Sequence, residues 1–306
     1  MLCGGIDLGG TKIEARLFDG AAARTLETRR IPTPKQSFEA MMAGLGEQLD
    51  WLEARSPGLP VGVALPGVTD PVTQENFTSN IPATGHSVGR SLAAARGRPI
   101  PVVNDCMAFA FSEAHGGAGD DFHSVMGLVL GTGVGGGFCL GSELAYRHAG
   151  LAVEIGHVGI SARALARHGL PLWSCGCGRV ACMETYASGT GLARLAKWKL
   201  GEDLTGAELA AHPRAEEVLE IWADLTADCL DTIQLLLDPD CIVLGGGLSN
   251  MAGIIERLET AFGALKLGNV RLPALRIARH GDSSGARGAA LVARMQAERT
   301  DRNNAP

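Results

Sequence analysis

The feature that most constrains the fold is a glycine-turned pair of strands that occurs twice, near the start of each half of the chain. Gly9-Gly10-Thr11 separates two apolar runs of strand length within residues 2–19, and Gly131-Thr132-Gly133 separates two more within residues 125–140. Turns of this composition favour β-hairpins and leave room for close backbone approach. The repetition predicts two related halves.

Between and after the hairpins, the pattern alternates between strands and helices. Apolar residues at helical spacing predict helices at about 36–54, 88–96, 105–116, 184–199, 213–237, 249–265 and 286–299. Short apolar runs predict buried strands at 61–65, 100–103 and 240–244. A chain of 306 residues suits two domains, and the glycine-rich segment 116–121 gives a boundary between residues 1–118 and a larger domain at 119–285. The last helix is expected to pack back on the first domain.

Composition narrows the class of partner. The chain has 27 Lys and Arg against 33 Asp and Glu, a net charge of −6, and no basic run, so neither nucleic acid nor an anionic membrane is a favoured partner. The N-terminus lacks the pattern of a signal peptide, and no apolar run reaches the roughly 18 residues that span a bilayer. A cytoplasmic protein with a small-molecule partner is expected.

One cluster has the composition of a zinc site. Cys175, Cys177 and Cys182 follow C-x-C-x4-C spacing, and His157 precedes them; these four residues supply the ligands that tetrahedral Zn²⁺ prefers. No fifth ligand is evident in the cluster, which favours a closed, structural site. The alternative is a set of ordinary buried thiols, which is how we interpret the five scattered cysteines: Cys3, Cys106, Cys139, Cys229 and Cys241.

Three glycine turns follow strand-like runs, at Asp7 to Lys12, at Gly131 to Gly133 and at Gly245 to Gly247. Backbone N–H groups in such turns can approach a polyphosphate, and Thr11 and Thr132 add hydroxyl groups. None of the turns has the P-loop form. The spacing Gly131-x-Gly133-x-x-Gly136 matches the dinucleotide fingerprint by letter, but it lies between two strands and does not open a helix. A single turn of this kind is commonly only a tight turn, whereas three indicate a phosphate-binding role.

Together these motifs resemble those of the ROK family of bacterial sugar kinases and repressors, over nearly the whole chain. The resemblance rests on Asp7 to Lys12, Pro66-Gly67, Asn104-Asp105, Gly131 to Gly137, Glu154 to His157 and Cys175 to Glu184. Within the family, the segments HGLPLWSCGCG and RHGDSSGARGAA are most similar to N-acetyl-D-glucosamine kinases. The resemblance implies an α/β fold of two actin-like ATPase domains, of the hexokinase type and ribonuclease H-like, with ATP and sugar in the cleft between them, and we expect a homodimer.

The resemblance also implies roles for individual residues. Asp105 aligns with the base that removes the proton of the sugar 6-hydroxyl, although its position alone favours a helix N-cap. Sugar contacts are implied at Gly67, Asn80, Asn104, Asp105, Glu154, His157 and Glu184. Nucleotide contacts are implied at Asp7, Gly9, Gly10, Thr11, Lys12, Gly131, Thr132, Gly133, Val134, Gly135, Gly136, Gly137, Gly245, Gly246 and Gly247. Asp7 is expected to face the Mg²⁺ of Mg-ATP; a turn-capping aspartate is the alternative.

Three other functions remain to be weighed against an N-acetyl-D-glucosamine kinase. A glucokinase or fructokinase of the same family differs only in its contacts with the sugar. A sugar-responsive repressor needs a helix-turn-helix before the ATPase-like domain, and Asp7 leaves no room for one. An actin-like filament or chaperone ATPase needs neither the sugar-binding glutamates nor the zinc loop.

Overall fold

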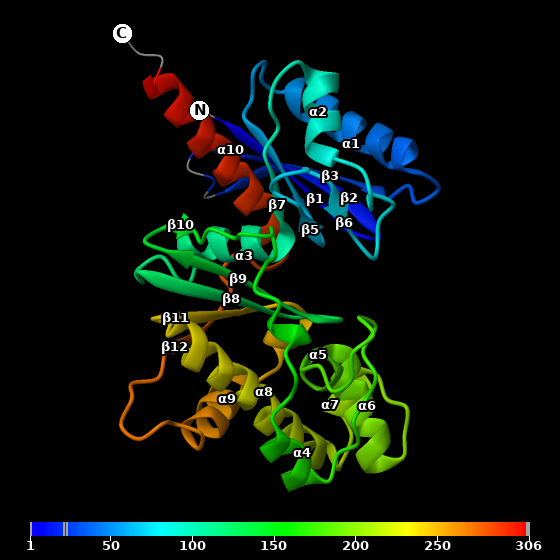
Figure 1. The fold of residues 1–306 in the computed structure, drawn as a ribbon, viewed down its shortest axis with the longest axis vertical. Coiled ribbons are helices and arrows are strands. Elements are labelled where there is room, and N and C mark those ends of the chain that lie inside the picture. Colours follow the sequence, from blue (N-terminus) through cyan, green and yellow to red (C-terminus); the bar gives the residue numbers. More distant parts are fainter. Residues whose placement is uncertain (1, 21, 23, 304–306) are drawn as a thin grey trace. The chain divides into compact units, whose positions relative to one another are not determined.

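The computed structural model describes residues 2–20, 22 and 24–303, which form two five-stranded sheets with surrounding helices (Figure 1). The first sheet has the order β3-β2-β1-β4-β7. Its strands are β1 (Cys3–Leu8), β2 (Lys12–Phe18), β3 (Thr25–Pro32), β4 (Val61–Leu65) and β7 (Val102–Asn104). The predicted first hairpin is confirmed, because β1 and β2 pair antiparallel around Gly9-Gly10-Thr11.

Helices α1 (Phe38–Glu53) and α2 (Val88–Arg96) share one hydrophobic core cluster with β1, β2 and β4. Each begins at a serine whose side chain accepts a backbone N–H of the first turn, which is a common way to start a helix. A two-stranded ribbon, β5 (Val68–Thr69) and β6 (Asn76–Phe77), follows β4. Strand β3 was not predicted, because it is an edge strand with charged, largely exposed side chains and no apolar run.

Helix α3 (Asp105–Ala114) and the final helix α10 (Ser284–Asn303) belong to the same compact unit as the first sheet. Figure 1 shows α10 beside the N-terminal strands. A side chain at Gly5 in β1 would lie 1.8 Å from the carbonyl oxygen of Ala286 in α10, so the helix lies directly against the strand. This unit comprises residues 1–120, 137–152 and 280–306. It thus includes residues 137–152, which the predicted boundary places in the second domain.

The second sheet has the order β10-β9-β8-β11-β12. Its strands are β8 (Ser124–Leu130), β9 (Val134–Leu140), β10 (Glu143–Leu144), β11 (Cys241–Gly245) and β12 (Ala274–Ile277). β8 and β9 are neighbours across Gly131-Thr132-Gly133, which confirms the second predicted hairpin. The two sheets have the same strand order when each is numbered along the chain. The prediction of two related halves is therefore confirmed at the level of sheet topology.

The second compact unit comprises residues 121–136 and 153–279. Its helical elements are η1 (Ile155–His157), α4 (Ala162–His168), α5 (Glu184–Ala187), α6 (Gly189–Leu200), α7 (Gly206–Ala210), α8 (Ala215–Leu237), η2 (Gly247–Asn250) and α9 (Ile254–Gly263). A third short turn, η3 (Gly281–Ser283), precedes α10 in the first unit. The single helix predicted at 184–199 is broken at Ser188, whose side chain accepts the N–H of Gly191 and starts α6 anew.

None of the helices in the described part of the chain combines the length and the apolar character that a bilayer crossing needs.

Candidate functional site

The carboxyl ends of three parallel strands meet at one edge of the first sheet. β1 pairs with β4, and β4 pairs with β7, in parallel. Asp7 lies near the end of β1, Gly67 follows β4, and Asn104 ends β7. Open α/β sheets bind ligands just beyond the carboxyl ends of their strands. The structure therefore brings predicted sugar and nucleotide residues of the first unit to the edge where such ligands bind.

Asn104 caps helix α3. Its Oδ1 accepts the backbone N–H groups of Cys106 and Met107 at 2.8 and 3.0 Å, and its Nδ2 donates to the carbonyl of Gly67 at 2.9 Å. Asp105 is the first residue of the helix, and its Oδ1 accepts the N–H of Cys106 at 2.8 Å. Position in the sequence favoured Asp105 as the N-cap of this helix, but the N-cap in the structure is Asn104. Asn104 also ties α3 to the turn after β4.

The negative charge of Asp105 affects the ionisation of Asp7. Burial raises the pKa of the Asp7 carboxyl from 3.8 to about 6, and the carboxylates of Asp105 and Glu14 add to this effect. A side chain at Gly285, in the first turn of α10, would lie 3.3 Å from the Asp7 carboxyl. Two carboxylates at one sheet edge form a donor set that suits a hard divalent cation such as Mg²⁺. Sequence reasoning did not single out Gly285, whose only signal is a glycine at the start of a helix.

The first glycine turn lies beside Asn80. A side chain at Gly10 would lie 3.0 Å from Cβ of Asn80, so these two predicted contact residues adjoin. Lys12 forms an ion pair with Glu14, in which its Nζ lies 2.8 Å from Oε2 of the glutamate. Glu14 is buried, with 1% of its side chain exposed, and also pairs with Arg16 at 2.5 Å. The Lys12 ammonium is therefore held by a carboxylate that the sequence analysis did not identify.

Two predicted nucleotide turns come together in the second unit. A side chain at Gly246, whose φ is +80°, would lie 2.5 Å from the carbonyl oxygen of Leu130, next to Gly131. The N-terminus of α6 joins them, since Gly189 donates its N–H to the carbonyl of Gly131 at 2.8 Å. Thr190 adds a hydrogen bond from its hydroxyl to the carbonyl of Thr132. The α6 N-terminus was missed because the sequence predicted one continuous helix there.

The remaining predicted nucleotide residues, Val134 to Gly137, lie within strand β9. A side chain at Gly136 would lie 2.4 Å from Cε of Met126, and one at Gly137 would lie 2.2 Å from the carbonyl oxygen of Cys106. These contacts account for the last two glycines by close packing of the strand, without a ligand.

The four predicted metal ligands come together in the second unit. The side-chain ligand atoms of His157, Cys175, Cys177 and Cys182 all lie within 4.8 Å of one another. Nδ1 of His157 is 3.8 Å from Sγ of Cys175, and Sγ of Cys177 is 3.7 Å from Sγ of Cys182. Ligands about 2.3 Å from one tetrahedral zinc stand about 3.8 Å apart. These two separations match edges of such a tetrahedron, and the donor set of one imidazole and three thiols fits zinc.

Backbone pairing brings the ligands together across a segment of irregular chain. Met183 donates its N–H to the carbonyl of Val158, and Gly159 forms an isolated bridge with Cys182. The backbone N–H of Arg179 lowers the pKa of Cys177. Burial instead raises the pKa of Cys175 to about 12. Zinc binds cysteine as the thiolate, so metal binding at these residues releases protons.

Glu184 connects the metal cluster to the second glycine turn. Its Oε1 accepts the thiol of Cys175 at 3.0 Å and lies 3.7 Å from Nδ1 of His157. A side chain at Gly133 would lie 2.8 Å from its Oε2. Glu154 immediately precedes η1, the turn that carries His157. The predicted sugar residues of the second unit are thus grouped around the metal cluster.

Comparison with known proteins agrees with the family that the sequence motifs indicate. A model of the ROK family matches residues 3–296. Over 295 residues, the chain is 41% identical to an N-acetylgalactosamine kinase of Shewanella sp. (strain ANA-3), covering 94% of this chain and 95% of that protein. Over 298 residues, it is 36% identical to an N-acetyl-D-glucosamine kinase of Pectobacterium atrosepticum, covering 94% of this chain and 97% of that protein.

The fold is also found in a solved structure. The crystal structure of a ROK hexokinase from Thermus thermophilus superposes with a TM-score of 0.83 at 34% sequence identity, covering 98% of this chain and 100% of the other. This likeness confirms the expected actin-like α/β fold of the hexokinase type.

Proposed function

This chain belongs to the ROK family and is an ATP-dependent sugar kinase, and on that premise we propose that it phosphorylates the 6-hydroxyl of N-acetyl-D-glucosamine. The observation that carries the proposed chemistry is the position of Asp105. It begins α3 at the carboxyl edge of the first sheet, while Asn104 fulfils the capping role.

In the proposed reaction, a carboxylate oxygen of Asp105 accepts the proton of the sugar 6-hydroxyl. The hydroxyl oxygen forms a bond to the γ-phosphorus of ATP, and the bond between that phosphorus and the bridging oxygen breaks, so that ADP leaves with the electron pair. Positioning and charge stabilisation account for most of the catalysis of phosphoryl transfer. Asn104 contributes by fixing the start of α3 against Gly67. Asp105 is the first residue of that helix, so its position is fixed as well.

The nucleotide is proposed to contact the glycine turns at 9–12, 131–133 and 245–247. Support comes from the backbone contact between the last two turns and from the α6 N-terminus beside them, because helix N-termini favour phosphate groups. Asp7 is proposed to hold Mg²⁺, directly or through water. The ion, when bound, neutralises the charge that develops on the transferred phosphoryl group.

The sugar is proposed to be oriented by Glu154, His157 and Glu184, with further contacts at Gly67 and Asn80. Carboxylates that accept hydrogen bonds from neighbouring hydroxyls orient a sugar ring well. His157 faces Cys175 through Nδ1, which leaves Nε2 as the nitrogen that can meet a hydroxyl. Zinc is proposed to be structural, holding the segment that carries these groups.

N-acetyl-D-galactosamine is a second candidate substrate, favoured by the 41% identity to an N-acetylgalactosamine kinase. The two sugars differ only in the orientation of the 4-hydroxyl. A pocket that hydrogen-bonds this hydroxyl can discriminate strongly between them, because the wrong epimer leaves a buried polar group unpaired.

The test is ADP release, coupled to a spectrophotometric assay, with N-acetyl-D-glucosamine, N-acetyl-D-galactosamine, glucose, mannose and fructose. We expect kcat/KM to be highest for an N-acetylhexosamine and the phosphate to be found at O6 by NMR. Asp105→Asn should lower kcat by about 100-fold or more with sugar binding retained. Asp203→Asn, an exposed aspartate paired with Lys197, is the control. Near-normal turnover of Asp105→Asn would refute the base, and higher kcat/KM for glucose or fructose would refute the sugar.

A further inference from the structure

Helix α4 lies within the segment that joins His157 to Cys175. Within α4, all of whose residues are described, only Ala164 is buried, so apolar packing contributes little to its position. A groove of about 1040 Å³ lies along it, lined by Arg167 and His168 together with residues of α6, α8 and α9. Polar contacts to Asp224 add to this packing in holding α4 in place.

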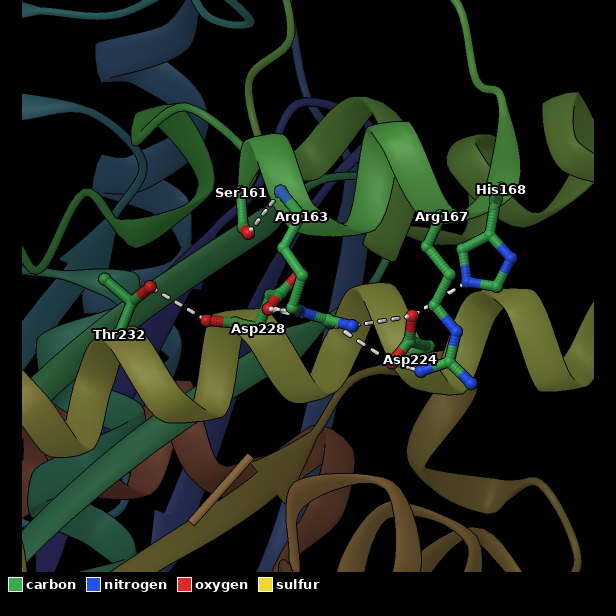
Figure 2. A network of polar contacts seen from close by, with 7 residues as sticks. All are labelled: Ser161, Arg163, Arg167, His168, Asp224, Asp228 and Thr232. Atoms are coloured by element: carbon green, nitrogen blue, oxygen red, sulfur yellow. Dashed lines mark hydrogen bonds and ion pairs between the residues drawn. The ribbon is translucent and has the colours of Figure 1, made fainter. Parts of the chain in front are cut away.

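Two buried aspartates of α8 supply those contacts (Figure 2). Asp224 lies 3.1 Å from Nη2 of Arg163, 3.3 Å from Nη1 of Arg167 and 2.7 Å from Nε2 of His168. Asp228 lies 2.9 Å from Nη2 of Arg163. The aspartates are only 8% and 5% exposed. Three side chains of a seven-residue helix thus converge on one carboxylate.

The network is stable only while α4 stays in place. Burial opposes the ionisation of Asp224, but hydrogen bonds from Arg163 and His168 outweigh it and lower the pKa of Asp224. A buried carboxylate that loses its partners is strongly unfavourable. If α4 moved away from α8, Asp224 would lose the hydrogen bonds that stabilise its charge, and the free energy of the folded state would rise. The network therefore fixes the position of the helix.

The same turn of α8 also holds the chain on the other side of the cysteines. Two residues before Asp224, Trp222 is fully buried and donates its Nε1 to the carbonyl of Ala187 at 2.9 Å. Ala187 ends α5, the helix that begins with Glu184. Neighbouring positions of α8 therefore hold the element that precedes the three cysteines and the element that follows them.

We propose that Asp224 is a positioning residue for residues 157–182, the segment that carries the four predicted metal ligands: through α4 it fixes the path from His157 to Cys175 and thereby the placement of Glu184 relative to both. The inference rests on the proposed metal centre and sugar contacts. It goes beyond them because Asp224 touches none of the four ligands and belongs to no predicted site. Its loss should loosen zinc and weaken sugar binding, while ATP binding is retained.

The test compares Asp224→Asn with wild type in the full-length, zinc-loaded protein. Zinc transfer to an excess of a chromophoric chelator should become at least about tenfold faster, in the range seen when residues that support metal ligands are changed. The KM for N-acetyl-D-glucosamine, or for the better N-acetylhexosamine, should rise about tenfold, with the KM for ATP within about twofold. Asp224→Glu should restore most of both properties, because it keeps the carboxylate.

Glu220→Gln is the matched control, since it removes one negative charge from an exposed position on the same helix. It should leave zinc transfer and both KM values unchanged. If Asp224→Asn does not fold, Arg167→Gln removes one contact at the exposed edge of the network and should shift zinc transfer in the same direction by about two- to threefold.

A lower melting temperature for Asp224→Asn with wild-type zinc transfer and sugar KM would reduce Asp224 to a structural role and overturn the proposal, as would equal effects of Asp224→Asn and Glu220→Gln. The zinc measurement needs no turnover, so it decides the proposal even if the sugar substrate has been assigned wrongly. A wild-type protein that binds no zinc would overturn the metal centre and this inference together.

Discussion

The two sheets have the same strand order but differ in what stands at the carboxyl ends of their parallel strands. In the first sheet these ends carry side-chain carboxylates and an amide, Asp7 and Asn104-Asp105. In the second sheet they carry the glycine turns at 131–133 and 245–247. Topology alone therefore does not assign chemistry, and the residue types at equivalent strand ends do.

The two halves also differ in how the chain continues after the hairpin. In the first half, β3 leads into α1 and back to β4 with ordinary helix packing. In the second half, the long connection from β10 to β11 first passes through the four predicted metal ligands and the short helices α4 and α5, of seven and four residues, and then forms α6, α7 and α8. Residues 169–183, all of them described and carrying the three cysteines, lie in no named helix or strand. A bound metal is an effective way to stabilise such a segment.

The largest expected effect is a loss of stability in the second half of the protein, which carries the predicted zinc ligands, with the first half unaffected. Cys177→Ser removes one zinc ligand at an exposed position, and we expect zinc to be lost and the melting temperature to fall by roughly 5 °C or more. A chelator should lower the melting temperature of wild type to a similar value and have no further effect on the variant. Metal analysis and thermal unfolding measure this. An unchanged melting temperature in a protein without zinc would refute the structural role.

The next effect tests whether the glycine turns are needed for geometry. Gly246→Ala forces a side chain into the left-handed region and against the carbonyl of Leu130; strain and overlap together should cost about 3 kcal/mol. Gly253→Ala has a similar φ of +69° but no atom within 4 Å, and should cost about 1 kcal/mol. Urea unfolding measures both. The KM for ATP should rise in the first variant only, and equal costs would show that overlap with Leu130 is unimportant.

The smallest effect concerns the carboxylates of the first sheet. The folded state binds a proton on Asp7 more tightly than the unfolded state does, so its stability falls as pH rises from 3.8 through about 6. Such a rise in pKa corresponds to at most about 3 kcal/mol, and partial exposure should reduce it to about 1 kcal/mol. Asp7→Asn should therefore stabilise the protein at pH 7.5 while lowering kinase activity, and the gain should shrink towards pH 5.

Asp70→Asn is the control for that experiment, because backbone N–H groups of Thr73 and Val72 lower the pKa of Asp70. Removing this carboxylate should change stability in the opposite direction and leave activity unchanged. A loss of stability in Asp7→Asn at pH 7.5 would contradict the conclusion that the charged form of Asp7 is destabilised by burial and by neighbouring carboxylates.

Local patterns in the sequence were sufficient for several features. Both hairpins, the strands at β4 and β11, and the helices at α1, α2 and α8 follow from glycine turns and apolar spacing. The metal cluster also followed from residue types, because few side chains combine as one histidine and three cysteines at short spacing. These features depend on short-range geometry, which neighbouring residues determine.

The sequence by itself thus determined the hairpins, the glycine turns and the identity of the metal ligands. Only the tertiary structure decided that Asn104 caps α3 in place of Asp105, that residues 137–152 join the first unit, and that Asp224 binds three side chains from a helix 56 to 61 residues earlier. Edge strand β3 and the α4 network were missed for the same physical reason. Their residues are polar, and polar residues reveal their partners only when distant parts of the chain pack together.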